Sequence, residues 1–206
     1  AWPPATSKAP PSVPAAASSG HITVRTPAGN GVSSSDFFVP PSPYVGTDVE
    51  VTGRMAIGES KTVNITQANK IGIILFDGVA GQRVTLGMAG VTFGAPNCCD
   101  TASVTIYKPN GVLVPALGFG PSGNGTDSQV LPVTGTYSIV VDPYNAYTGS
   151  VTLNLFEDVP VPITINGSAV TLNLSQVGQN GRLSFNGTAG QRVSVGLSGI
   201  TISPGY

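Results

Sequence analysis

The chain has 206 residues, of which 9% are charged, and its formal net charge is −1. Globular domains usually have about a quarter charged residues. The low charge here, with abundant Gly, Pro, Ser, Thr and Val, indicates an almost entirely β structure. Without a basic cluster, neither nucleic acid nor an anionic membrane surface is expected as a partner. The apolar runs, such as residues 71–76, are too short to insert into a membrane.

Residues 1–20 are rich in Pro, Ala and Ser and lack any alternating apolar pattern. Such a composition predicts an extended arm. Trp2 is the candidate anchor of this arm on a neighbouring domain or another chain, and contact with its own domain is the alternative.

Residues 21–43 should form two short strands, 21–25 and 36–39, around a turn at 27–31. This stretch resembles the closing strands of an IPT/TIG domain, an immunoglobulin-like module. The resemblance rests on Gly20-x-Ile22-x-Val24-x-Thr26-Pro27-x-Gly29 and on Phe37-Phe38-Val39. It implies that this part is the tail of such a module.

Residues 44–158 contain seven alternating runs with glycine turns between them, at 48–52, 61–66, 71–76, 83–86, 103–107, 137–141 and 150–155. Strands that bury one face alternate in this way, and seven in one unit predict an antiparallel β-sandwich of the jelly-roll kind. The expected core residues are Val63, Ile65, Ile73, Leu75, Val84, Leu86, Val104, Ile106, Tyr137, Ile139, Val141, Val151, Leu153 and Leu155.

This unit resembles the β-sandwich repeats of large bacterial surface and secreted proteins, including prepeptidase C-terminal-like domains and the domain strings of Rhs-type proteins. The matching residues are Gly58-Glu59-Ser60, Phe76-x-Gly78-x-Ala80-Gly81-Gln82-Arg83-Val84, Thr105-Ile106-Tyr107-x-Pro109-x-Gly111 and Thr134-Gly135-Thr136-Tyr137-x-Ile139-x-Val141-Asp142-Pro143. No peptidase or YD motif is present, so the resemblance implies an accessory role only.

Residues 159–206 repeat the beginning of that unit at an offset of 109 residues. Phe76-Asp77-Gly78-Val79-Ala80-Gly81-Gln82-Arg83-Val84 returns as Phe185-Asn186-Gly187-Thr188-Ala189-Gly190-Gln191-Arg192-Val193. A domain-sized offset indicates tandem domains. We expect this segment to be the first half of a second sandwich, without counterparts of residues 98–157. An exposed apolar face and unpaired strand edges should result.

The adjacent cysteines, Cys98 and Cys99, match no metal-site spacing. They could form a vicinal disulfide, pair with other chains, or remain two small residues of a loop.

Ligand-binding candidates are Tyr144, Asn145 and Tyr147, two aromatic rings and an amide in one connection between strands. Aromatic platforms of this kind suit a sugar ligand, although packing of the turn over the sandwich end is the simpler interpretation. A cofactor is not expected. Structural calcium is the metal alternative, with oxygen ligands drawn from Asp100, Asp127, Asp142 and Asn145.

Catalytic residues are not evident. His21 is the single histidine, in an expected strand, and its simplest role is that of a solvent-facing residue. Carboxylates such as Asp77 and Asp142 are interpreted as turn residues.

The sequence therefore predicts a non-enzymatic structural or adhesive segment of an exported bacterial surface protein. Its expected partners are neighbouring domains or identical subunits, bound head to tail through strand edges into a fibre. A carbohydrate-binding accessory module is the alternative. Low charge and many hydroxyls favour an extracellular or cell-surface location.

Overall fold

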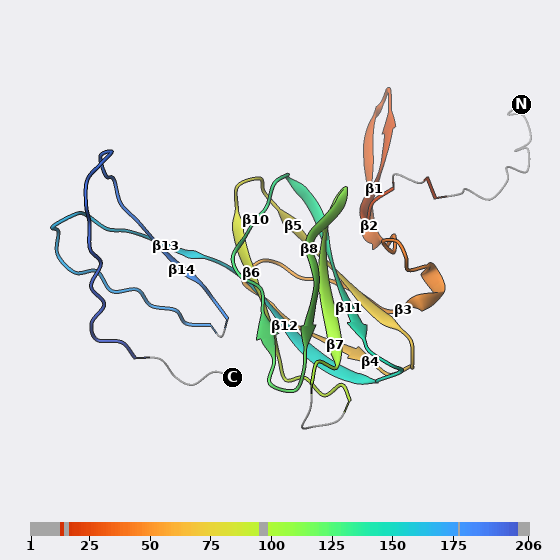
Figure 1. Ribbon diagram of the computed structural model, residues 1–206. Helices are drawn as coiled ribbons and strands as arrows, with labels where there is room; N and C mark the ends of the chain where they lie inside the picture. The colour runs from red at the N-terminus through yellow and green to blue at the C-terminus, as the bar shows by residue number, and fades with distance from the viewer. Residues whose placement is uncertain (1–12, 15–16, 95–98, 177, 202–206) are drawn as a thin grey trace, which may run out of the picture.

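The computed structural model describes residues 13–14, 17–94, 99–176 and 178–201. An N-terminal hairpin, a two-layer β-sandwich and a C-terminal unit of mostly irregular backbone follow one another along this part of the chain (Figure 1). Its single helical element is the 3-10 turn η1 (Gly46–Asp48). The predicted all-β class and the sandwich are confirmed. None of the helices in the described residues has the length and apolar character needed to cross a membrane.

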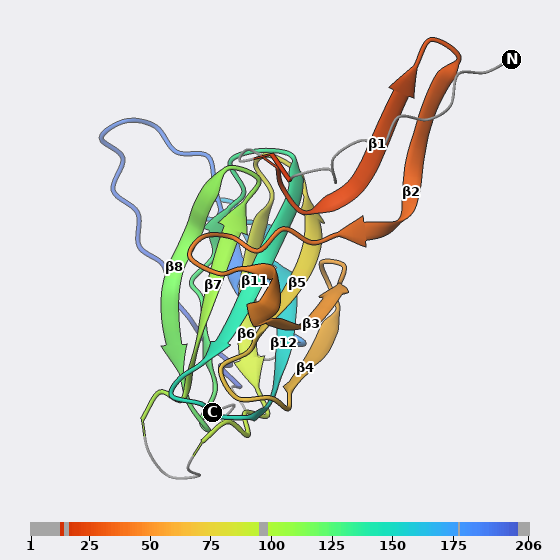
Figure 2. The ribbon, with the colours of Figure 1, turned by 90° about the vertical axis from the view of Figure 1, so that its right-hand side faces the viewer.

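Two five-stranded sheets form the sandwich, with β12 and β11 in interior positions (Figure 2). The first sheet runs β10 (Gln129–Val130), β6 (Arg83–Ala89), β12 (Gly149–Glu157), β4 (Ser60–Ile65), and β9 (Asn124–Gly125) also pairs with β6. The second runs β3 (Val49–Arg54), β5 (Ile71–Gly78), β11 (Gly135–Pro143), β7 (Ala102–Lys108), β8 (Gly111–Phe119).

Alternating apolar side chains of both sheets fill the space between them. Val63 and Ile65 of β4 and Val151 and Leu153 of β12 are fully buried there. Phe76 stacks on Tyr137 with ring centroids 5.1 Å apart. Of the expected core residues, all but Ile73 and Leu75 belong to this cluster. Each fully buried aliphatic or aromatic side chain contributes about 1.5–3 kcal/mol to folding.

Ile73 and Leu75 are buried on the other face of β5, which corrects the expectation that they face the sandwich core. They pack with Ile71 and Val140 beneath the segment 38–49, which crosses the outside of the second sheet (Figure 2). Ile74 and Phe76 face the sandwich core instead. Because both faces of β5 are covered, its sequence is continuously apolar, and no alternation shows which residues face which side.

Two features of the second sheet differ from the predicted antiparallel arrangement. β3 pairs parallel with β5. β8 is an additional strand at the edge of the sheet, and it contains Pro115. A proline cannot donate to a ladder and is accepted on edge strands, so it concealed this strand in the sequence.

The outer face of the first sheet is kept polar by hydroxyl and amide groups. Ser60 donates to Asn154 Oδ1 at 2.7 Å, and the hydroxyls of Thr62 and Thr152 lie 3.0 Å apart on the same strands. Cross-strand polar pairs of this kind solvate a sheet face without charged side chains. They account for part of the low charge of the chain.

The N-terminal hairpin consists of β1 (Gly20–Thr26) and β2 (Gly29–Phe37), close to the strands expected there. It projects away from the sandwich (Figure 2). Nearly all of its side chains are exposed or half-buried.

The C-terminal unit contains one pair of short strands, β13 (Val159–Pro162) and β14 (Gly181–Ser184). They pair parallel and stand 109 residues after positions within β3 and β5, which also pair parallel. Pro160 and Pro162 are accepted because β13, like β3, has a neighbour on one side only.

A turn also recurs at this offset. Gln82 N donates to the carbonyl of Val79 at 3.0 Å, and Gln191 N donates to that of Thr188 at 3.0 Å. The third residues of the two turns, Gly81 and Gly190, have φ of 87° and 81°. Positive φ at this position favours glycine.

Replacing the glycine of each turn should affect the sandwich differently. A Cβ at either position meets nothing within 4 Å, so the effect is on the backbone alone. We expect Gly81→Ala to lower the free energy of unfolding of the sandwich by about 1–2 kcal/mol. Gly190→Ala should leave it unchanged, because the second turn lies outside the sandwich. Urea unfolding followed by circular dichroism measures both, and equal losses would contradict the separation of the two units.

Candidate functional site: the exposed apolar surface of residues 163–201

Residues 163–201 expose large apolar side chains at positions whose counterparts form the sandwich core. Seven of these side chains are between 36% and 73% exposed, whereas the residues 109 positions earlier are at most 8% exposed. The pairs are Leu174 and Ile65, Leu183 and Ile74, Phe185 and Phe76, Val193 and Val84, Val195 and Leu86, Leu197 and Met88, and Ile200 and Val91. An apolar surface of this extent marks an interaction site.

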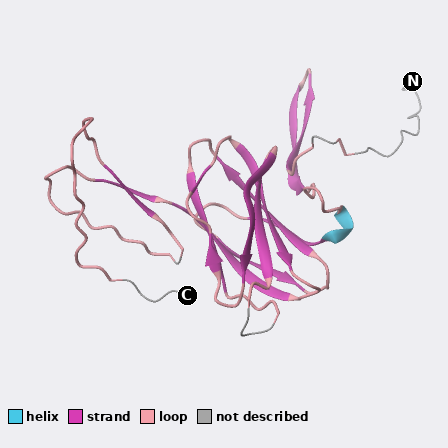
Figure 3. Cartoon of the chain, in the orientation of Figure 1, coloured by secondary structure: helices cyan, strands magenta, loops and turns pink. Residues whose placement is uncertain are grey.

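The backbone explains why these side chains remain exposed. β12 lies between β4 and β6 in the sandwich and pairs antiparallel with both. The segments 169–174 and 192–198 are the counterparts of β4 and β6, and neither is a strand (Figure 3). β3 and β5 pair directly, without an intervening strand, and their counterparts do form strands. The described C-terminal unit therefore lacks a strand in the place of β12.

An open hollow of about 1380 Å³ lies within this unit and is lined only by residues between 163 and 201. It is lined by Leu183, Phe185 and Val195, together with residues of the segments 169–174 and 192–198, neither of which is a strand. Unpaired N–H and C=O groups beside an apolar surface are what an added β-strand binds. The hollow offers this combination and no concentration of charge.

Polar side chains fix the point where the C-terminal unit begins. Asp158, directly before β13, is 7% exposed and accepts a hydrogen bond from Ser128 Oγ at 2.6 Å. Asn180 Nδ2 donates to Thr85 Oγ1 at 2.9 Å, so a residue of the second unit bonds a strand of the sandwich. The unit is thus anchored at one end while its apolar surface stays open.

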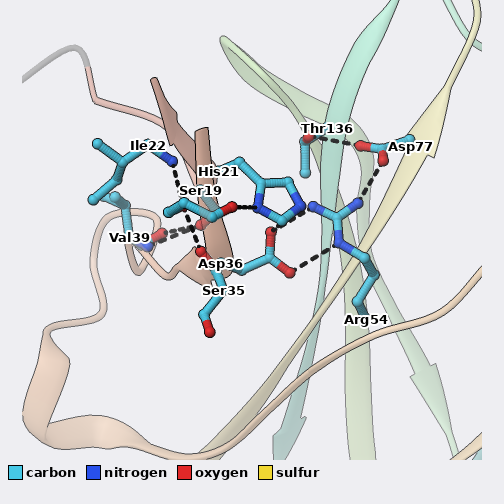
Figure 4. A network of polar contacts seen from close by, with 10 residues as sticks. Ser19, His21, Ile22, Ser35, Asp36, Val39, Arg54, Asp77 and Thr136 are labelled. Carbon is cyan, nitrogen blue, oxygen red and sulfur yellow. Dashed lines mark hydrogen bonds and ion pairs between the residues drawn. The ribbon is translucent and has the colours of Figure 1, made fainter. Parts of the chain in front are cut away.

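Arg54 joins the hairpin at the other end to the sandwich (Figure 4). Its Nε and Nη2 donate to the two carboxylate oxygens of Asp36 at 2.8 and 2.6 Å. Its Nη1 donates to Asp77 Oδ2 at 2.6 Å, and Thr136 donates to Asp77 Oδ1 at 2.7 Å. The Asp36 side chain is 10% exposed, and hydrogen bonding by Arg54 holds its pKa below the usual value.

His21 lies beside this network on β1. Its Nδ1 is 2.9 Å from the carbonyl oxygen of Ser33, and its Nε2 is 3.8 Å from Asp36 Oδ1. The ring is 41% exposed, as expected for a strand residue that faces solvent.

Asp77 and Asp142 lie within strands, which corrects their interpretation as turn residues. Asp77 binds Arg54, and Asp142 accepts a hydrogen bond from the Tyr44 hydroxyl at 2.7 Å. Burial raises the pKa of Tyr44, and the bond to Asp142 adds to the shift. Asp142 therefore fastens the segment before β3 to the second sheet, and Asp77 holds Arg54, which binds the hairpin.

The predicted sugar-binding residues lie in one turn, in which Tyr147 N donates to the carbonyl of Tyr144 at 3.0 Å. Tyr147 packs against the sandwich core, Tyr144 is 37% exposed, and Asn145 has a positive φ of 50°. The three residues lie in one turn, and of the two rings that of Tyr144 is the exposed one. Sugar binding stays a prediction.

The calcium candidates are spread over several elements. Asp100 and Asp127 are exposed, Asp142 bonds Tyr44, and Asn145 belongs to the turn described above. The described residues contain no group of three or more His, Cys, Asp or Glu placed to hold a metal ion.

Cys99 is disulfide-bonded. Cys98 lies outside the described residues, so the vicinal pairing stays a prediction. Trp2, the expected anchor of the arm, also lies outside them.

Neither a protein-family model nor a curated protein matches the chain. Among solved structures, it is similar to the pre-peptidase C-terminal domain of a collagenase from Bacillus anthracis, with 9% identity, a TM-score of 0.39, and coverage of 52% of this chain and 95% of that one. It is also similar to PliG, a periplasmic inhibitor of g-type lysozyme, from two bacteria. The Salmonella Typhimurium protein has 14% identity, a TM-score of 0.36, and coverage of 52% and 99%. The Aeromonas hydrophila protein has 16% identity, a TM-score of 0.32, and coverage of 51% and 97%.

Identities and scores at this level do not carry function to this chain. The first match belongs to one of the domain classes that the sequence resembles. The IPT/TIG resemblance and the division into tandem units stay predictions.

The Arg54 network generates a test of how the hairpin is held. We expect Arg54→Met to accelerate hydrogen exchange at the backbone amides of β1 and β2, because Asp36 loses its bidentate partner. Exchange within β11 and β12 should change little. Equal protection of the hairpin in both proteins would contradict a tethering role for Arg54.

The ion pair of Arg54 with Asp36 also predicts that protection of the hairpin amides against hydrogen exchange depends on pH. The pKa of Asp36 is lowered in the folded state, so its contribution is complete above the ordinary pKa of 3.8 and is lost as the pH falls through the lower folded value. Hydrogen exchange of the hairpin, corrected for the intrinsic rate, should therefore be constant above that range and rise below it. Arg54→Met should show a much smaller rise.

Proposed function

We propose that this chain is a non-catalytic structural module of an exported bacterial surface protein. In this proposal the C-terminal half-sandwich takes up a β-strand from a partner, and repeated contacts of this kind build an extracellular fibre. The exposed apolar side chains at residues 163–201, each the counterpart of a buried core residue, carry the proposal.

A β-strand from a partner would bury the exposed apolar side chains of this unit and would also supply hydrogen bonds to its backbone. Apolar side chains such as Val195 and Leu197 gain from leaving water, and the backbone of a segment such as 192–198 gains hydrogen-bond partners. A small molecule could fill the hollow but would not supply an alternating ladder of donors and acceptors. A strand meets both needs in a single contact.

A non-catalytic, exported role agrees with the chemistry of the described residues. The carboxylates of Asp36, Asp77, Asp142 and Asp158 are engaged in hydrogen bonds that hold segments together. The disulfide at Cys99 suits an oxidising compartment. The hydroxyl-covered first sheet remains solvated at low net charge.

Association of the full chain should depend on the exposed apolar surface. We expect analytical ultracentrifugation to show concentration-dependent assembly and electron microscopy to show filaments. The variant Val195→Asp with Leu197→Asp should weaken assembly by at least about tenfold, because two carboxylates would have to be buried.

Val79→Asp is the matched control, since Val79 is 60% exposed on a turn of the complete sandwich. It should assemble like the unchanged protein. All three proteins should show the same unfolding transition of the sandwich. A chain that remains monomeric at high concentration would contradict the proposed function.

A further inference from the structure

The N-terminal strand β1 has the residue pattern of β12. Gly20-His21-Ile22-Thr23-Val24 begins β1, and Gly149-Ser150-Val151-Thr152-Leu153 begins β12. Both segments read Gly, any residue, β-branched, Thr, aliphatic. Their glycines also share an unusual backbone, with φ of 136° at Gly20 and 146° at Gly149.

The two strands differ in the number of paired edges and in the burial of their apolar side chains. β12 has a neighbour on each edge, and its Val151 and Leu153 are fully buried. β1 pairs only with β2 among the described strands, and its Ile22 and Val24 are 51% and 59% exposed. β1 therefore offers a strand edge and apolar side chains that are not yet bound.

The positions of the N-terminal hairpin and the C-terminal unit prevent β1 from contacting residues 163–201 of its own chain. The hairpin and the C-terminal unit lie on opposite sides of the sandwich (Figure 1). Arg54 fixes the base of the hairpin, and Asp158 with Asn180 fixes the C-terminal unit. A contact between β1 and the half-sandwich must therefore join two copies of the chain, and a head-to-tail contact of this kind propagates into a filament.

We propose that β1 of one copy adds to the segment 192–198 of the next copy, antiparallel, in the place that β12 takes beside β6. This inference rests on the proposed function and names the donor strand for it. Ile22 and Val24 then enter the hollow, as Val151 and Leu153 enter the core of the complete sandwich. The second copy thus supplies the strand pattern that the repeat itself uses to close.

The register follows from the complete sandwich. Thr152 lies opposite Ala89, and Leu153 lies opposite Met88. Transferred to the proposed contact, Thr23 of one copy lies opposite Ser198 of the next, and Val24 lies opposite Leu197. Directly opposed residues of antiparallel strands have Cα atoms about 4.5–5.5 Å apart, within the range of a disulfide.

A cysteine pair tests this register in the full chain. The variant with both Thr23→Cys and Ser198→Cys should form covalent multimers on mild oxidation, seen as a ladder in non-reducing electrophoresis. The two single variants are controls for the native Cys98 and Cys99. A second pair, Thr23→Cys with Ser194→Cys, keeps the strand face but shifts the register by four residues, and it should cross-link at least about fivefold less.

Substitutions in the donor strand separate this inference from the proposed function. Ile22→Asp with Val24→Asp should weaken assembly by at least about tenfold. Val32→Asp is the matched control, because Val32 is 63% exposed but pairs with Thr23 and so lies on the opposite face of the hairpin. It should leave assembly unchanged.

The outcomes distinguish the two ideas. Assembly that needs Val195 and Leu197 but persists in the Ile22/Val24 variant would overturn β1 as the donor and leave the acceptor role intact. Equal cross-linking of the two cysteine pairs, seen as equal ladders of covalent multimers, would also overturn the inference. Absence of assembly in the unchanged protein would overturn both.

Discussion

β4 and β6 become strands of the first sheet only with a strand hydrogen-bonded between them, and the rest of the structure depends on this pairing. In residues 44–158 this strand is β12, and its ladder to both neighbours completes the first sheet. Among the described residues of the C-terminal unit the same two segments have no such neighbour, and they do not become strands. β13 and β14 form because their counterparts, β3 and β5, need no intermediary. The lack of this strand among the described residues thus accounts for which elements of the second unit form and which side chains are exposed.

Alternation and glycine turns were sufficient to predict most of the sandwich. The sequence predicted the strands around Val63 and Val151 because each buries a single face. It could not assign the two faces of β5, since segment 38–49 covers the second face and removes the polar positions. Nor could it show that β3 runs parallel to β5, because direction depends on contacts distant in sequence.

The candidate site was predictable to a similar degree. The exposed apolar side chains of residues 163–201 follow from the 109-residue repeat, because the first copy shows which residues should be buried. The tether of Arg54 to Asp36 and Asp77 does not, since three isolated charges carry no spacing signal and meet only through the fold. The turn with Tyr144 and Tyr147 was found from its aromatic residues, but burial of one ring against the core depends on tertiary packing.

The order of segments along the chain also bears on how the protein folds. β12 is preceded by one copy of its neighbours, β4 and β6, and followed by another at 169–174 and 192–198. Until the sandwich closes, either copy is a sterically plausible mate, and pairing with the later one would give a circular permutant of the same architecture. Repeat proteins misassemble through such exchanges between neighbouring units. A chain in which residues 44–158 close first avoids this topological error, which the 109-residue repeat in the sequence makes available.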